Sequence, residues 1–166
     1  MKDKLHKGVT LLELTIAMGM WLALSIGIFL LWQYVTNTTA NMLMRQNALE
    51  NSRAAMDGLV MNIQLASHIR LETDSNNVLE RLTLTERNPQ GQLHNYVFDF
   101  NINAAQGTPR HQVLRLGENE FVSNIAAIYM EYVYGRRINI AVVSACYEPL
   151  RLYGSVNVRY KNVVVG

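Results

Sequence analysis

The chain has 166 residues, 49% of them hydrophobic, and this length suits one compact domain with an additional segment rather than two full domains. The formal net charge of +2 is too small to indicate a nucleic-acid partner by itself, and Lys2, Lys4 and Lys7 supply much of the excess. A single cysteine, Cys146, excludes an intramolecular disulfide, and we expect it to be a small buried residue of a strand.

A short basic stretch, residues 1–8, precedes a strongly apolar segment. Residues 14–32 form an uncharged run of 19 residues. As a helix, this run would span about 28 Å, close to the hydrocarbon thickness of a bilayer. Basic residues beside such a segment tend to stay in the cytoplasm. The pattern predicts a single pass through the cytoplasmic (inner) membrane, with the N-terminus inside and the remaining chain outside.

Three simpler interpretations compete with this one: a cleaved secretory signal, a plain signal anchor and a buried core helix. The apolar run is longer than the usual hydrophobic region of a signal peptide, and no A-x-A-like cleavage site follows it. A core helix of this length is rarely apolar on every side. A plain anchor fits the length of the run, so only Glu13 distinguishes a plain anchor from a more specialised segment.

Glu13 lies directly before the uncharged run, where a plain anchor has no use for a carboxylate. A charged side chain deep in a bilayer costs about 2.5 kcal/mol or more. No cation lies nearby on the same face of the predicted helix. A positive charge created by cleavage of the chain is the natural partner, because a paired carboxylate is less costly to bury than an isolated one.

The segment GVTLLELT, which begins at Gly8 and contains Glu13, resembles the class III signal of type IV prepilins and pseudopilins. The resemblance implies cleavage between Gly8 and Val9 by a membrane-embedded prepilin peptidase, followed by N-methylation of Val9. It further implies that Glu13 faces the terminal amine of a neighbouring subunit. Family members often carry Phe at the first mature position, where this chain has Val9. The implied partners are other pilin or pseudopilin subunits, the peptidase, an inner-membrane assembly platform and membrane lipid.

Helical periodicity continues beyond the apolar segment. Apolar residues recur with heptad spacing and predict a stripe that packs on a globular head; they are Met42, Leu49, Met56 and Ile63, with Leu59, Val60 and Ala66 beside them. Without an interrupting proline, we expect one helix of which residues 9–35 form the transmembrane and assembly part and residues 36–70 an amphipathic part, with Gly58 as the one point where it could break.

Alternation of apolar and polar residues begins near residue 68 and indicates strands in the rest of the chain, with the globular head assigned to 71–166. Strands are expected over 79–84, 93–100, 113–116, 126–134, 138–146 and 152–165, with turns at 88–91, 117–119, 121–125 and 135–137 and a loop over 101–110. The predicted fold class is therefore α+β, a long N-terminal helix packed on a mainly antiparallel β-sheet head, which is the lollipop that the family resemblance also implies.

A second resemblance covers residues 110–162. Segments 122–125, 129–134 and 158–162 are similar to the heads of PilW-type minor pilins, of J-type minor pseudopilins of type II secretion and of ComGF-type competence pilins. This resemblance implies a minor subunit at the tip or initiation complex of a filament. The machine stays open between a twitching pilus, type II secretion and DNA uptake.

The sequence shows no motif typical of a metal site, a phosphate-binding loop or a catalytic nucleophile. The four histidines lack metal-ligand spacing, and the sequence has no glycine-rich phosphate loop or nucleophile motif, so we expect neither a cofactor nor an enzyme. A second hypothesis is a filament-borne module that binds DNA or a surface, with Arg136 and Arg137 in a predicted turn as candidate phosphate contacts. The predicted strands also gather Tyr129, Tyr132, Tyr134 and Tyr147; alternation places Tyr129 and Tyr132 on opposite faces, so only some of these could belong to a stacking platform.

Overall fold

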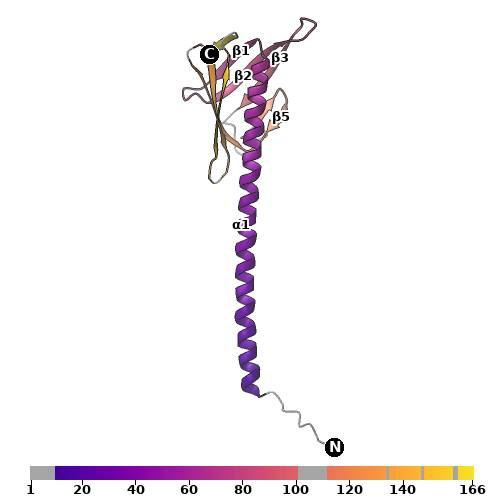
Figure 1. Ribbon diagram of the computed structural model, residues 1–166, viewed down its shortest axis with the longest axis vertical. Helices are drawn as coiled ribbons and strands as arrows, with labels where there is room; N and C mark the ends of the chain where they lie inside the picture. Colours follow the sequence, from indigo (N-terminus) through magenta and orange to yellow (C-terminus); the bar gives the residue numbers. More distant parts are fainter. Residues whose placement is uncertain (1–9, 101–111, 134, 147, 159–160) are drawn as a thin grey trace, which may run out of the picture. The chain divides into compact units, whose positions relative to one another are not determined.

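The computed structural model describes residues 10–100, 112–133, 135–146, 148–158 and 161–166 (Figure 1). These residues form one long N-terminal helix followed by a domain of strands. The elements are α1 (Leu11–Leu65), β1 (His68–Thr73), β2 (Leu79–Arg87), β3 (Leu93–Phe100), β4 (Leu114–Leu116), β5 (Asn119–Val122), β6 (Ile125–Val133), β7 (Arg137–Ser144), β8 (Arg151–Asn157) and β9 (Asn162–Val165). The chain divides into two compact units, Met1–Leu43 and Met44–Gly166, which are described separately.

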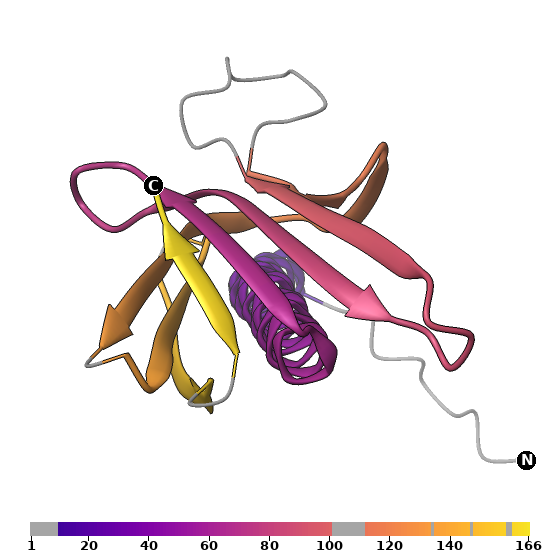
Figure 2. The same ribbon diagram turned by 90° about the horizontal axis from the view of Figure 1, so that it is seen from above.

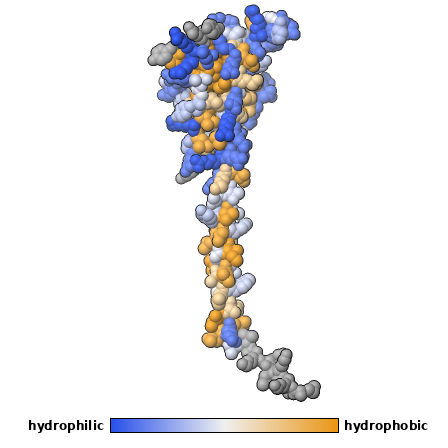
Figure 3. All heavy atoms as spheres, viewed as in Figure 1, coloured by the Kyte–Doolittle hydropathy of each residue, from blue (hydrophilic) through white to orange (hydrophobic). Residues whose placement is uncertain are grey.

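The part of α1 that belongs to the first unit is apolar and unburied. Its large apolar side chains, from Leu11 to Val35, are all exposed, as the orange surface along this part of the helix in Figure 3 shows. An 18-residue window of the helix has a mean hydropathy of 2.2, and none of that window is buried. By length and composition, this helix could cross a membrane.

The part of α1 that belongs to the second unit buries one stripe. The stripe consists of Ala48, Ser52, Ala55, Met56, Leu59 and Ile63, at the spacing of neighbouring helical turns. The predicted positions Met56, Leu59 and Ile63 are confirmed, whereas Met42 is 66% exposed. The prediction missed the small residues of the stripe because alanine and serine carry little hydrophobic signal, although their size lets strands approach the helix closely.

The helix ends earlier than we predicted. It stops at Leu65 rather than residue 70, and it continues unbroken through Gly58. The strand domain correspondingly begins at His68 rather than residue 71. Alternate burial of Ile69 and Leu71 marks the change from helical to strand periodicity. The backbone of Ser67 already donates a hydrogen bond to the carbonyl of Thr85 on β2, at 2.8 Å, so pairing with the sheet replaces the next helical turn.

A lysine from the far end of the chain caps the C-terminus of α1. The last turn of the helix contains no basic residue. The Nζ atom of Lys161, between β8 and β9, donates to the carbonyl of Gln64 at 2.6 Å and to the carbonyl of Ala66. Cations and donors near a helix C-terminus stabilise its unpaired carbonyls. Partial burial lowers the pKa of the Lys161 ammonium from its ordinary value.

We expect Lys161→Met to lower the free energy of unfolding of the fragment 37–166 by about 1–2 kcal/mol, because two carbonyls lose a charged donor. Chemical denaturation followed by circular dichroism measures this change. Lys161→Arg is the matched control, since it keeps the charge and the donors, and it should lose much less. Equal stability of Lys161→Met and the parent fragment would show that water replaces the cap without loss.

The strands form two sheets rather than one. The larger sheet has six strands in the order β5-β4-β3-β2-β1-β9, and the smaller has three in the order β6-β7-β8. Figure 2, which looks along the helix, shows strands of both sheets around it. A single hydrophobic cluster joins them: Leu59 and Ile63 of α1, Phe98 of the larger sheet and Ile140 of the smaller all belong to it. The expectation of a mainly antiparallel head holds except at β9, which is parallel to β1.

Two predicted segments have other structures. The expected turn at 121–125 is shorter than predicted: its first two residues belong to β5, which pairs with β4 in the hairpin around Gly117, Ser123 and Asn124 lie between the strands, and Ile125 begins β6. The expected last strand, 152–165, is two strands in different sheets, β8 and β9. The sequence of this region alternates almost throughout, so its periodicity carried no sign of the change of sheet. The predicted loop 101–110 lies outside the described residues.

Cys146 does not lie in a strand as predicted. It follows the end of β7 and is partly buried. Its Sγ lies 3.2 Å from Oγ of Ser144 and donates to the carbonyl of Glu148 at 2.8 Å. The buried Ser144 hydroxyl also accepts a hydrogen bond from the backbone N–H of Leu150. These hydrogen bonds stabilise the connection between β7 and β8.

A row of alternating charges crosses the outer face of the larger sheet. Strand pairing places Glu72 opposite Arg81, Arg81 opposite Asp99, Asp99 opposite Arg115 and Arg115 opposite Glu120. Nε of Arg81 lies 2.7 Å from Oδ1 of Asp99, and this carboxylate raises the pKa of Arg81. Opposite charges at facing positions stabilise a sheet, whereas a register slip would put like charges together. The row therefore helps to fix the register of five strands.

Candidate functional site at the start of the helix

Thr10 and Glu13 form a reciprocal hydrogen-bonded pair at the first turn of α1. The backbone N–H of Thr10 donates to Oε2 of Glu13 at 3.0 Å, and the Thr10 hydroxyl donates to the same oxygen at 3.1 Å. In return, the backbone N–H of Glu13 donates to Oγ1 of Thr10 at 3.3 Å. This arrangement is a capping box, in which two side chains satisfy backbone donors that the start of a helix leaves unpaired.

The capping box explains where the helix begins and how Glu13 is oriented. The pattern T-x-x-E before an apolar run is visible in the sequence, but the sequence reasoning concentrated on the charge of Glu13 and missed it. Negative charge in the first turn is also favourable because the helix dipole is positive there. Among the described residues, the box engages Oε2 of Glu13 and leaves Oε1 open to an external donor.

The other predicted processing residues cannot be placed beside Glu13. Gly8 and Val9 lie outside the described residues, so the expected cleavage and methylation positions remain predictions. What the geometry offers is a single exposed carboxylate, held at the start of an unburied apolar helix. Such a group can pair with an ammonium.

The predicted basic turn is present between β6 and β7. Arg136 is exposed in the turn, and Arg137 is the exposed first residue of β7 rather than a turn residue. Gly135 has φ of 62°, a left-handed conformation that glycine adopts without strain. In the described part of the chain, neither arginine makes an ion pair. The structure therefore brings together Arg136 and Arg137 but leaves them in a different unit from Glu13.

The predicted tyrosine cluster is only partly present. Tyr129 is exposed on the outer face of β6, whereas Tyr132 packs against the core from the opposite face. Tyr134 and Tyr147 lie outside the described residues. The prediction missed Tyr153 of β8, which is 74% exposed. Strand pairing joins Tyr129 to Tyr153 through one intervening residue, a relation that the sequence alone could not give.

Three comparisons with known proteins were negative. No protein-family model, curated protein or solved structure matches the chain. Within the described residues, no group of three or more histidine, cysteine or acidic side chains is arranged to hold a metal ion. The candidate site therefore rests on the geometry of the helix start and on the sequence around it.

Proposed function

We propose that this chain is a minor pilin or pseudopilin, cut after Gly8 by a prepilin peptidase and incorporated into a type IV pilus-like filament. The filament would belong to a pilus, a secretion machine or a DNA-uptake machine. The family resemblance of the first 35 residues and of residues 110–162 supports this proposal. The long apolar helix followed by a domain of strands also supports it.

One observation carries the proposal: an exposed carboxylate stands at the start of an unburied apolar helix. Glu13 is exposed in the first turn, and the following helical window is apolar and unburied. If this helix is embedded in lipid or packed among other helices, an unpaired carboxylate is destabilising by several kcal/mol. The new amine at Val9 of a neighbouring subunit would offset this cost by pairing with Glu13.

The N-terminal mass of the protein tests the proposal, measured in cells with and without the prepilin peptidase. We expect a mature chain that begins at Val9, with or without an added methyl group, and we expect both peptidase deletion and Gly8→Ala to abolish cleavage. Glu13→Gln should still be cleaved yet be lost from sheared filaments, because it keeps the shape but not the charge. Abundance of the parent protein matching that of the bulk subunit would contradict the minor role.

A plain, uncleaved membrane anchor is the second candidate, and the capping box favours it. In that case Glu13 needs no partner subunit, since its role is to satisfy the backbone of Thr10 and the helix dipole. Intact Met1 in every sample of the same experiment would select this alternative. Glu13→Gln would then leave the amount of protein in the membrane unchanged, because glutamine also serves at this position of a capping box.

A further inference from the structure

The outer face of the three-stranded sheet carries an open row of aromatic side chains. Ile138, Ile140 and Val142 of β7 are buried, so the alternate residues of this strand point away from the core. Ala141 is one of these, and it lies opposite Tyr129 on β6 and Tyr153 on β8. The three residues form a row across the full width of the sheet.

The row leaves a gap between its two tyrosines. Because neighbouring strands are about 4.8 Å apart, the backbones of Tyr129 and Tyr153 are separated by about 10 Å. Ala141 is too short to fill the space between them. The tyrosines are 38% and 74% exposed, and in the described part of the chain the one ring–ring contact joins Phe98 and Phe121 instead. Both tyrosine rings are therefore available to stack on a planar ligand.

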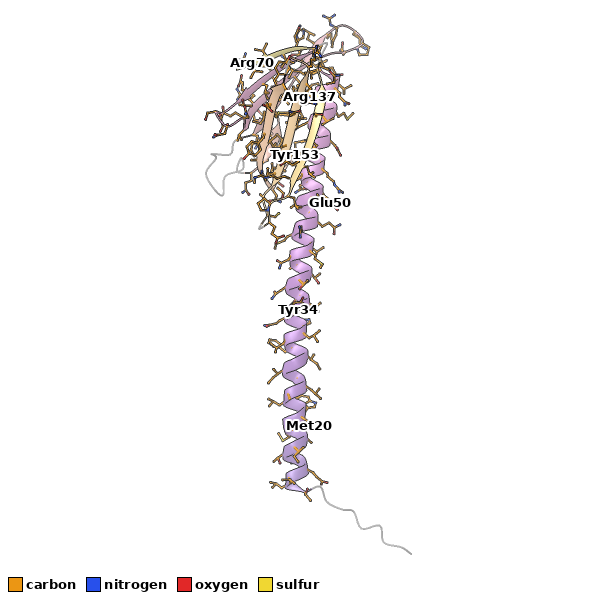
Figure 4. The ribbon with its side chains drawn as sticks, turned by 60° about the vertical axis from the view of Figure 1, so that its left-hand side comes forward. Met20, Tyr34, Glu50, Arg70, Arg137 and Tyr153 are labelled. Atoms are coloured by element: carbon orange, nitrogen blue, oxygen red, sulfur yellow. The ribbon has the colours of Figure 1, made fainter. Side chains whose placement is uncertain are left out.

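Arginines flank this row on both sides. Arg151 is two residues before Tyr153 on the same face of β8, at about 7 Å along the strand. Arg137 is four residues before Ala141 on the same face of β7, at about 13 Å in the opposite direction. Figure 4 labels Tyr153 and Arg137 on the strands of this sheet, and Arg136 in the adjoining turn adds a third cation.

Among the described residues, three of the four arginines on the larger sheet have a partner within the fold, and the exception is Arg87 at the end of β2. On the larger sheet, Arg70 and Arg81 lie within 2.9 and 2.7 Å of carboxylate oxygens, and Arg115 donates to the carbonyl of Glu118. On the smaller sheet, the ion pairs of the described residues include neither Arg137 nor Arg151. These two guanidinium groups are thus not held in ion pairs with described residues and can attract an anion.

We propose that the outer face of the sheet β6-β7-β8 binds single-stranded nucleic acid, with Tyr129 and Tyr153 stacking on bases and Arg137 and Arg151 contacting phosphates. Aromatic side chains interleaved with cations are the chemistry by which proteins hold unpaired strands. Stacked bases in a duplex have their faces covered by neighbouring bases, so exposed tyrosines favour binding of a single strand. This site is independent of the proposed processing, and its failure would leave that proposal untouched.

One acidic residue on this face would repel the phosphates of a bound nucleic-acid strand. Glu131 lies on the same face, two residues after Tyr129 on β6. It is at the opposite edge of the sheet from β8, which carries Arg151, Tyr153 and no acidic side chain. Phosphates are therefore expected to follow β8, the strand farthest from Glu131.

Fluorescence anisotropy tests the site, with the full chain in a non-ionic detergent and a labelled 12-nucleotide oligo-dT. We expect binding at ~50 mM salt that weakens steeply by ~200 mM, as phosphate contacts require. Tyr153→Leu should weaken binding about 5- to 100-fold, the range measured for loss of one stacking side chain. Arg137→Gln and Arg151→Gln should each lower the salt slope by about 0.7. Glu131→Gln should strengthen binding about twofold.

Matched controls come from the larger sheet. Tyr96→Leu removes a tyrosine that is 37% exposed, and Arg70→Gln removes an arginine that is already paired. Both should leave binding unchanged. Absence of binding at ~50 mM salt would overturn the proposal. Tighter binding of a duplex of the same length, or an unchanged affinity of Tyr153→Leu, would also overturn it. So would complete competition by dextran sulfate at equal charge. Each of these results would mean that the protein does not recognise the bases.

Discussion

Replacing Ile63 by alanine is expected to lower the free energy of unfolding of the fragment 37–166 by about 3–5 kcal/mol. Ile63 is fully buried in the cluster that joins α1 to both sheets, so its truncation leaves a cavity bounded on several sides. A loss of this size is a large fraction of the stability of a small domain, which is about 5–15 kcal/mol. Urea denaturation of the two fragments gives the difference directly.

Met61→Ala is the control for this prediction. Met61 lies on the same helix two residues away, but it is 62% exposed. Because alanine has the higher helix propensity, the substitution should change stability by less than about 0.5 kcal/mol. Similar losses for both variants would mean that the helix does not use the Ile63 face to pack against the sheets.

Replacing Gly58 by alanine should destabilise the domain only while Phe121 is present. An added Cβ would lie 2.3 Å from Cζ and 2.6 Å from Cε1 of the Phe121 ring. This ring also packs edge-on against Phe98, with centroids 5.6 Å apart, so moving it away from the helix disrupts a second contact. We expect a net loss of about 1–2 kcal/mol, despite the gain of up to about 1 kcal/mol that alanine brings to a helix interior.

The double variant separates the two effects. In a Phe121→Ala background the steric conflict is absent, and Gly58→Ala should stabilise the domain by about 0.5–1 kcal/mol. The sign of the effect therefore reverses between the two backgrounds, with a coupling energy of about 2–3 kcal/mol. Four urea denaturation curves measure it. A Gly58→Ala effect of the same sign in both backgrounds would show that Phe121 does not restrict this position.

Much of the fold could be predicted from periodicity, and its failures have a common cause. The spacing of Met56, Leu59 and Ile63 predicted the packed face of the helix, and the turn at 88–91 predicted the hairpin of β2 and β3. Periodicity reports which residues are buried, but not which sheet buries them. For that reason the split between β8 and β9 and the parallel pairing of β9 could not be foreseen.

The two candidate sites also differ in how far the sequence could predict them. The capping box of Thr10 and Glu13 is formed by residues three positions apart, so it could have been predicted from the sequence, whereas the pairing of Glu13 with an amine stays a prediction. The row through Ala141 is made by strand pairing and is not local in sequence. Arg137 was predicted as a contact residue for a different reason, its place near a turn, and Tyr153 was not predicted at all.

The parallel pairing of β9 with β1 constrains the order in which the domain can fold. His68 and Asn162, whose side chains are 3.3 Å apart, are separated by 94 positions in sequence. Long-range pairings of this kind form slowly, because the intervening chain must first be ordered. The larger sheet cannot be completed during synthesis until residues 162–165 have emerged. Until then the helix also lacks Lys161, so the emerging chain presents an unfinished sheet edge and an uncapped helix to any chaperone that meets it.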